Sequence, residues 1–485
     1  MTRRAATTTA PAPTTRNRKG RRILAGALLA GSALALVPVA DGSAASAASA
    51  PLGVTWMRSV ASPGTPARYD RVGVIKVGPS TAKNVLVLEP GTSAGAAYFV
   101  PLAKWIVAKA KGWQVWSVER RENLLEDQSE LALFKQGKAT ATQLFDYYLG
   151  YLKDPSISPH FHIIADATVA YAKQWGMNVA VQDLHTVITA AKRLGGKVVL
   201  GGHSLGGSVV TAYATWNFHG HAGADELAGL VYIDGGSGTT PETAATATQT
   251  LAALDAPSVS PWLAFGGITA PYAGIFSSTG AAAALLDPNG PSLAEASGLL
   301  PAEIVPPVPV TNLGQYGYAL NAATSPQSLL AAQAHIGTGL DTATSPAGWN
   351  GAGALTPIAR FATMFSGYPI KNADGTEWYF PQRLTDDTAA VDNGNANPAQ
   401  KVLGVDATMG HRLPKTLRIY AFGARLGGPT VLEDAQLLAR QSHIPARNLT
   451  LVNRQSTYSH NDPAGAYPTN AFFSHLVPFL GAVAR

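Results

Sequence analysis

Short apolar stretches alternate with amphipathic stretches over most of the chain, and this pattern predicts an α/β fold. Eight stretches have the apolar or alternating composition of β-strands. They span residues 54–60, 71–78, 83–89, 113–119, 198–200, 227–233, 416–423 and 448–453. Stretches of helical period, such as 96–112 and 431–441, lie between several of them. Strands and helices that alternate in this way form a mostly parallel, doubly wound sheet with helices on both faces.

The alternation stops between residues 237 and 415. This stretch is rich in Ala, Thr, Gly and Pro and has only short segments of helical period. Its aromatic residues exclude a disordered linker; they are Trp262, Phe265, Tyr272, Tyr316, Phe365 and Tyr379. We therefore interpret 237–415 as a large cap inserted over the active site. The core domain then consists of a first part at 51–236 and a second part at 416–485.

The excess positive charge belongs to the first 50 residues. The 485-residue chain has 36 Lys and Arg against 30 Asp and Glu, a net charge of +6. Seven of the basic residues and only one of the acidic residues lie in 1–50, which accounts for the whole excess. The remainder is neutral overall, so the composition does not indicate a nucleic-acid partner.

Residues 1–50 have the organisation of a signal peptide. A basic stretch ends at Arg21-Arg22, an apolar stretch follows at 23–40, and Ala48-Ser49-Ala50 offers a cleavage site of small residues. We expect secretion by the Sec route or, because of the paired arginines, the Tat route. The alternative is an uncleaved membrane anchor, since the apolar run approaches the roughly 17–20 residues that span a bilayer. Only this segment would then contact a membrane.

The candidate chemistry begins at residues 197–207, which read KVVLGGHSLGG. They fit the pattern G-x-S-x-G, in which a serine occupies a sharp turn between a strand and a helix. Gly91–Gly95 fits the same pattern around Ser93, but it follows Pro90 in a stretch typical of a loop. The strand–turn–helix context therefore favours Ser204 over Ser93 as a nucleophile.

Three segments make the chain similar to serine esterases and lipases of the α/β-hydrolase family. They are GGHSLGG around Ser204, VLVLEPGTSAG at 85–95 and TYSHNDP around His460. The resemblance covers nearly all of the chain outside the cap and the signal peptide. It implies a catalytic triad in the chain order Ser, then Asp or Glu, then His. It also implies a small-molecule or lipid-like ester as the substrate.

His460 is the best candidate for the general base. It follows the predicted strand 448–453 after a short loop, and loops at strand ends commonly present catalytic groups. His475 lies within the predicted last helix, where a packing role suffices. His411 and His443 lie near loops that follow no predicted strand.

The acid of the triad has more than one candidate. The family's usual position, just after the strand 416–423, contains no carboxylate here. Asp234 ends the strand that follows the nucleophile, a position that some similar lipases use. Glu433 and Asp434 follow the usual strand but lie several residues into the next element. We favour Asp234, and the other two remain alternatives.

Acyl transfer also needs donors for the negatively charged oxygen of the transition state, and loss of one donor costs ~3–4 kcal/mol. We expect the backbone N–H of Leu205, at the start of the helix, to be one donor. The loop after the strand 83–89 would supply the other, and Thr92 is the first choice there, with Ser93 next.

We expect no metal and no cofactor. The pairs His160-x-His162 and His219-x-His221 have metal-like spacing but no clear third ligand. The chain has no cysteine, which excludes thiolate ligands, disulfides and a cysteine nucleophile. The expectation is a secreted serine hydrolase that cleaves carboxylic esters through an acyl-enzyme. A secreted peptidase or amidase with the same triad, and a non-catalytic hydrolase-like surface binding protein, are the alternatives.

Overall fold

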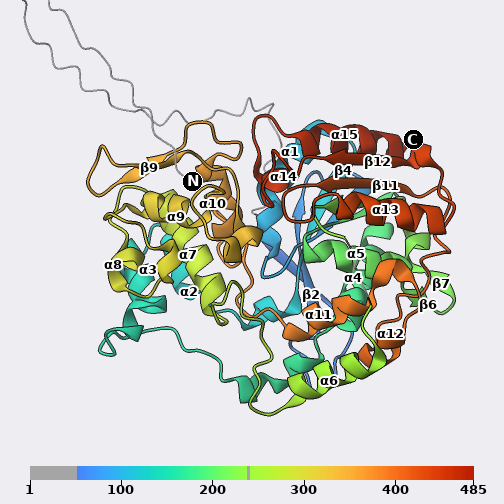
Figure 1. The fold of residues 1–485 in the computed structure, drawn as a ribbon, viewed down its shortest axis with the longest axis horizontal. Coiled ribbons are helices and arrows are strands. Elements are labelled where there is room, and N and C mark those ends of the chain that lie inside the picture. The colour runs from blue at the N-terminus through green and yellow to red at the C-terminus, as the bar shows by residue number, and fades with distance from the viewer. Residues whose placement is uncertain (1–51, 237–240) are drawn as a thin grey trace, which may run out of the picture. The chain divides into compact units, whose positions relative to one another are not determined.

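A central eight-stranded sheet organises the chain in the computed structural model, which describes residues 52–236 and 241–485 (Figure 1). The strand order is β1-β2-β4-β3-β5-β8-β11-β12. These strands are β1 (Val54–Arg58), β2 (Arg71–Val77), β3 (Asn84–Glu89), β4 (Trp113–Glu119), β5 (Val198–His203), β8 (Gly229–Ile233), β11 (Arg418–Gly423) and β12 (Leu449–Asn453). β2 runs antiparallel to β1 and β4, and all other neighbours are parallel. The predicted mostly parallel sheet is confirmed.

Helices cover both faces of this sheet because each inner strand is apolar on both sides. In β3, Val85 and Val87 belong to one apolar cluster, whereas Leu86 and Leu88 belong to the other. The helices that complete the first cluster are α4 (Met177–Lys192), α5 (Leu205–Thr215) and α13 (Thr430–Gln441). Those that complete the second are α1 (Val100–Lys109) and α15 (Ala471–Ala484).

A second group of helices lies beside the sheet domain, on the left in Figure 1. It contains α2 (Ser129–Lys135), α3 (Ala141–Tyr148), α7 (Tyr272–Leu286), α8 (Leu293–Ser297), α9 (Asn312–Leu320), α10 (Ile358–Ser366) and the hairpin of β9 (Gly339–Asp341) and β10 (Gly348–Asn350). Leu131 and Tyr148 from the first part of the chain share an apolar cluster here with Ile275 and Trp378. Residues on both sides of position 237 therefore build this group.

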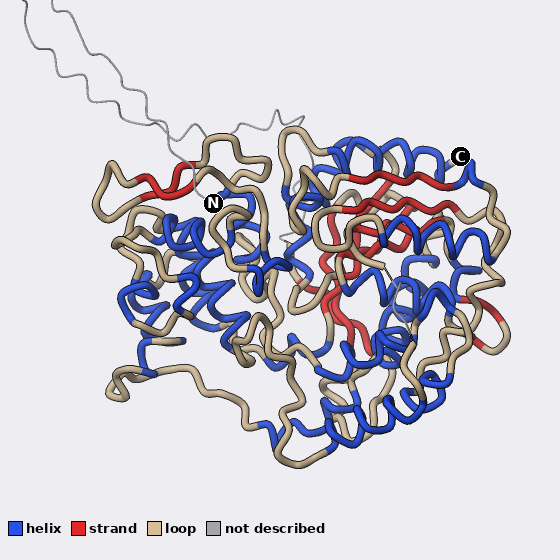
Figure 2. Tube along the Cα trace, viewed as in Figure 1, coloured by secondary structure: helices blue, strands red, loops and turns tan. Residues whose placement is uncertain are grey.

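The rest of 237–415 packs on the sheet domain. Its helices are α6 (Ala244–Asp255), α11 (Gln382–Asp387) and α12 (Pro398–Leu403). Leu384 and Leu403 belong to the same apolar cluster as the inner face of α4 and α5. Figure 2 shows these helices below the strands, apart from the second group. The domain boundaries derived from the sequence remain a prediction.

The predicted signal peptide, residues 1–50, lies outside the described residues. In the part of the chain that is described, no helix is both long and apolar enough to cross a membrane. The short strands β6 (Asn217–Phe218) and β7 (His221–Ala222) and the short helix α14 (Asp462–Gly465) complete the strands and α-helices of the described residues.

Candidate active site

Ser204 occupies the sharp turn between β5 and α5, as the sequence predicts. β5 ends at His203 and α5 begins at Leu205, so the serine is the only residue between them. Its φ of 56° and ψ of −129° lie in a region that residues other than glycine rarely adopt, so the backbone at Ser204 is strained. A side chain at Gly202 would collide with the backbone of Gly206, and one at Gly206 would collide with that of Glu89. Both glycines of the motif are therefore sterically required.

His460 and Asp234 form a buried pair. Asp234 follows β8 directly, and His460 lies in the loop between β12 and α14. Nδ1 of His460 donates to Oδ2 of Asp234 at 2.7 Å, and both side chains are at most 1% exposed. The structure thus joins the histidine and the acid that the sequence favours, although they lie 226 positions apart.

Three backbone amides also donate to Asp234. Oδ1 accepts from Ala424 at 2.6 Å and from Gly427 at 3.0 Å, and Oδ2 accepts from Leu426 at 3.2 Å. Burial alone would raise the pKa of this carboxyl group, but the hydrogen bonds from His460 and Ala424 outweigh it and lower the pKa. Asp234 is therefore a carboxylate at neutral pH and accepts all four hydrogen bonds.

The alternative acids are placed differently. Glu433 is exposed on α13. Asp434 accepts a hydrogen bond from Nδ2 of Asn393 at 3.4 Å. Within the described residues, the carboxylate that contacts His460 is that of Asp234.

Ser204 and His460 line one cavity together with Thr92 and Ser93. Ser93 has a positive φ of 54°. The amide N–H groups of Thr92 and Leu205 donate to no other protein group within 52–236 and 241–485. A catalytic role remains a prediction for Ser204, His460, Asp234, Thr92 and Leu205.

Several contacts fix the loop that carries His460. Nε2 of His203 donates to the backbone carbonyl of His460 at 2.9 Å. Burial lowers the pKa of His203 to about 3, so this histidine is neutral. The hydroxyl of Tyr98 donates to Oδ1 of Asn461 at 2.8 Å. Asp462 accepts from the backbone of Ser459 at 2.7 Å. Sequence reasoning did not identify His203, although it lies inside the serine motif.

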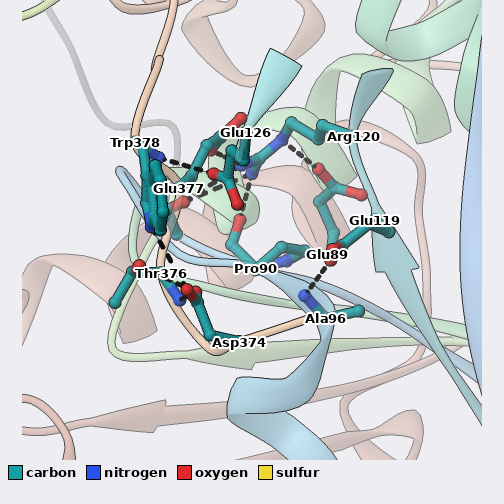
Figure 3. Close-up of polar contacts among 11 residues, drawn as sticks. Glu89, Pro90, Ala96, Glu119, Arg120, Glu126, Asp374, Thr376, Glu377 and Trp378 are labelled. Carbon is teal, nitrogen blue, oxygen red and sulfur yellow. Dashed lines mark hydrogen bonds and ion pairs between the residues drawn. The ribbon is translucent and has the colours of Figure 1, made fainter. Parts of the chain in front are cut away.

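A network of buried charges lies beside Pro90, which begins the loop that contains Thr92 (Figure 3). Its centre is Arg120, directly after β4, which pairs with Glu89 at 2.9 Å and with Glu377 at 2.8 Å. The neighbouring Glu119 accepts a short hydrogen bond from the amide of Ala96. Burial raises the pKa of Glu119 to about 8. Sequence reasoning missed this network; the charged residues Glu119–Glu122, at and directly after the end of the predicted strand 113–119, were the available signal.

The two histidine pairs with metal-like spacing have ordinary contacts. The ring of His160 stacks on Tyr151 with centroids 4.3 Å apart. His219 has a positive φ of 56°, and Nδ1 of the exposed His221 lies 3.7 Å from Asp225. Among the residues that the structure describes, no group of three or more His, Cys, Asp or Glu side chains could hold a metal ion.

No protein-family model and no curated protein sequence matches the chain. Among solved structures, it is similar to a proposed lipase from Sulfolobus solfataricus, with 13% identity over 90% of this chain and 99% of that one and a TM-score of 0.45. A monoglyceride lipase from Saccharomyces cerevisiae has 10% identity, coverage of 90% and 96%, and a TM-score of 0.39. A carboxyl esterase from Bacillus coagulans has 11% identity, coverage of 90% and 100%, and a TM-score of 0.38. Likeness this distant does not identify a reaction, which must be inferred from the geometry of the site.

Proposed function

We propose that the protein is a serine hydrolase that cleaves carboxylic esters through an acyl-enzyme. The observation that carries this proposal is the buried His460–Asp234 pair at a cavity that Ser204 also lines. A serine hydroxyl is a weak nucleophile until a neighbouring base removes its proton. The strained turn at Ser204, the unpaired amides of Thr92 and Leu205 and the ionised Asp234 supply the other parts of this chemistry.

The pair with Asp234 determines which nitrogen of His460 acts. A carboxylate only accepts hydrogen bonds, so Nδ1 carries a proton and Nε2 of the neutral ring has a free lone pair. In the proposed reaction, Nε2 takes the proton of Ser204 as Oγ attacks the ester carbonyl, and returns it to the leaving alcohol as the C–O bond breaks. Water then repeats these steps on the acyl-enzyme and releases the acid.

The amides of Thr92 and Leu205 would stabilise the negative charge that develops on the carbonyl oxygen. Leu205 is the first residue of α5, so its N–H has no partner within the helix and the positive end of the helix dipole lies there. Thr92 contributes through its backbone, so the identity of its side chain matters little. Fixed donors of this kind often supply the largest part of the rate enhancement.

A second cavity supports the proposal that the acyl group of the substrate is apolar. It lies among α7, α9 and the loop around Phe265. Phe265, Ala273, Ser277 and Ala332 line both cavities, so the second adjoins the catalytic one. Its walls are almost entirely apolar, and burial of each CH₂ group of a chain would contribute ~0.8 kcal/mol.

The export signal predicted in residues 1–50 belongs to the same proposal and would place the enzyme outside the cell.

An assay with p-nitrophenyl esters of increasing acyl length, combined with a fluorophosphonate probe, tests the proposed function. We expect labelling of the protein by the probe and hydrolysis of the esters, with kcat/KM rising from short to medium chains. A matching p-nitroanilide series separates an esterase from an amidase. A folded protein that is neither labelled nor active would be a binding protein, and the proposal would be wrong.

Gly280 provides a test of where the acyl chain lies. It is in the middle of α7 and lines the second cavity, and a Cβ added there would lie 3.8 Å from the ring of Tyr316. Gly280→Leu should fill part of the cavity and lower kcat/KM for long-chain esters at least tenfold, while short-chain esters react normally. Gly280→Ala fits without displacement and serves as the control. An equal loss for all chain lengths in Gly280→Leu would place the acyl chain elsewhere.

A further inference from the structure

The loop Pro90–Ser93 contributes Thr92 to the catalytic cavity, and one arginine binds two of its backbone carbonyls. Arg120 is 6% exposed, and its guanidinium donates to the carbonyls of Pro90 and Gly91, to the latter at 3.2 and 3.3 Å. Glu89 and Glu377 accept its other hydrogen bonds. Figure 3 shows Arg120 between these carboxylates, with Pro90 within its reach.

The geometry of the peptide bond connects this contact to the cavity. A peptide unit is planar and trans, so the C=O of one residue and the N–H of the next point in opposite directions. Because Arg120 binds the carbonyl of Gly91, the N–H of Thr92 points away from Arg120. Thr92 lines the catalytic cavity. A guanidinium on the carbonyl also polarises the peptide unit, which makes the N–H of Thr92 a stronger donor.

The remainder of the loop is also held in place. The carbonyl of Ser93 accepts from the backbone amide of Glu377 at 3.0 Å. A Cβ on Gly91 would lie 2.8 Å from Cβ of Ser204, and a Cβ on Gly95 would lie 2.6 Å from the carbonyl of Thr376. The loop is therefore packed against the nucleophile at one end and against residues 374–377 at the other.

We propose that Arg120 is a positioning residue, which holds the loop Pro90–Ser93 so that the N–H of Thr92 faces the oxygen of the reacting carbonyl. This role rests on the proposed esterase function. Arg120 does not touch the substrate; it acts through the peptide unit between Gly91 and Thr92. Glu89 and Glu377 orient the guanidinium, and Glu377 also binds the loop through its own backbone.

The test compares Arg120 with its neighbour Arg121. Arg121 is also buried, at 1% exposure, and pairs with Asp183 at 2.9 Å and Asp70 at 3.2 Å, away from the loop. Removal of either cation leaves buried carboxylates unpaired, so Arg120→Met and Arg121→Met should both lower the melting temperature. Only Arg120→Met should lower kcat, by about 10²-fold with little change in KM, as expected for one misplaced oxyanion donor.

Two further measurements separate positioning from a loss of stability. Binding of a trifluoromethyl ketone, whose adduct with Ser204 carries an oxyanion, should weaken in Arg120→Met in proportion to the loss of kcat/KM, and remain unchanged in Arg121→Met. If Arg120→Met does not fold, Arg120→Lys takes its place; it keeps the charge but not the planar fork that binds two carbonyls, and should lose about tenfold in kcat.

The outcomes are distinguishable. Equal kcat values for the Arg120 and Arg121 variants, measured on folded protein, would overturn the positioning role while the esterase function stands. A wild-type protein that hydrolyses no ester would instead overturn the proposed function itself.

Discussion

Replacement of Ser204 by alanine should lower kcat for ester hydrolysis on the order of 10⁶-fold and abolish labelling by a fluorophosphonate. The methyl group cannot form the acyl-enzyme, and the base and the oxyanion donors then act on nothing but bound water. The fold should persist, because Ser204 makes its structural hydrogen bond through its backbone N–H, to the carbonyl of Ile233 at 3.1 Å. Melting temperature and far-UV circular dichroism should therefore match those of the wild type.

Ser93→Ala is the matched control, since Ser93 is the central residue of the other G-x-S-x-G sequence and lines the same cavity. Its exchange leaves the backbone amides of the loop in place, so we expect kcat within about tenfold of the wild type. Retention of labelling in Ser204→Ala, with its loss in Ser93→Ala, would assign the nucleophile to Ser93 instead.

Replacement of Asp234 by asparagine should lower kcat on the order of 10⁴-fold. Each carboxylate oxygen accepts two hydrogen bonds, and an amide nitrogen in place of either oxygen cannot accept them. If the nitrogen faces His460, Nδ1 becomes the acceptor and the ring proton moves to Nε2, which is then unable to take the proton of Ser204. If the nitrogen faces the backbone instead, the amides of Ala424 and Gly427 lose their acceptor.

Glu433→Gln and Asp434→Asn in the same assay discriminate among the candidate acids. We expect both to keep kcat within a few-fold of the wild type, because neither side chain is the one that contacts His460. A loss of 10³-fold or more in either variant, with a mild effect in Asp234→Asn, would show that the acid had been misassigned.

Local patterns were sufficient to predict the sheet but not the packing of the other elements. β3 and β5 lie in the interior of the sheet, and their runs Val85–Leu88 and Val198–Leu200 are apolar on both faces, so composition alone marks them. The amphipathic patterns of α2 and α3 would be the same whether these helices packed on the sheet domain or in the second group of helices. Their apolar residues meet α7, more than a hundred positions later, and no local pattern specifies that choice.

The residues of the candidate site also differ in how far local sequence patterns predict them. Ser204 and His460 can be found from the sequence because each follows a recognisable strand within a short motif. From the sequence, Asp234 was one of several candidates for the acid. The hydrogen bonds that distinguish it, from His460 and from the backbone amides of residues 424–427, are visible only in the structure. Arg120 had no motif at all, and its role becomes visible only when the carbonyls of Pro90 and Gly91 are seen beside it.

The bond between Arg120 and Glu377 also has a consequence for the order of events during refolding. It joins residues 257 positions apart, whereas β3, β4 and the turn after them are close in sequence. Closure of so long a loop costs more chain entropy than closure of a short one, and contacts between distant residues slow folding. A chain whose sheet has formed before Glu377 arrives has an unfixed loop at Thr92. We therefore expect enzymatic turnover to return later than secondary structure when the denatured protein is diluted into buffer.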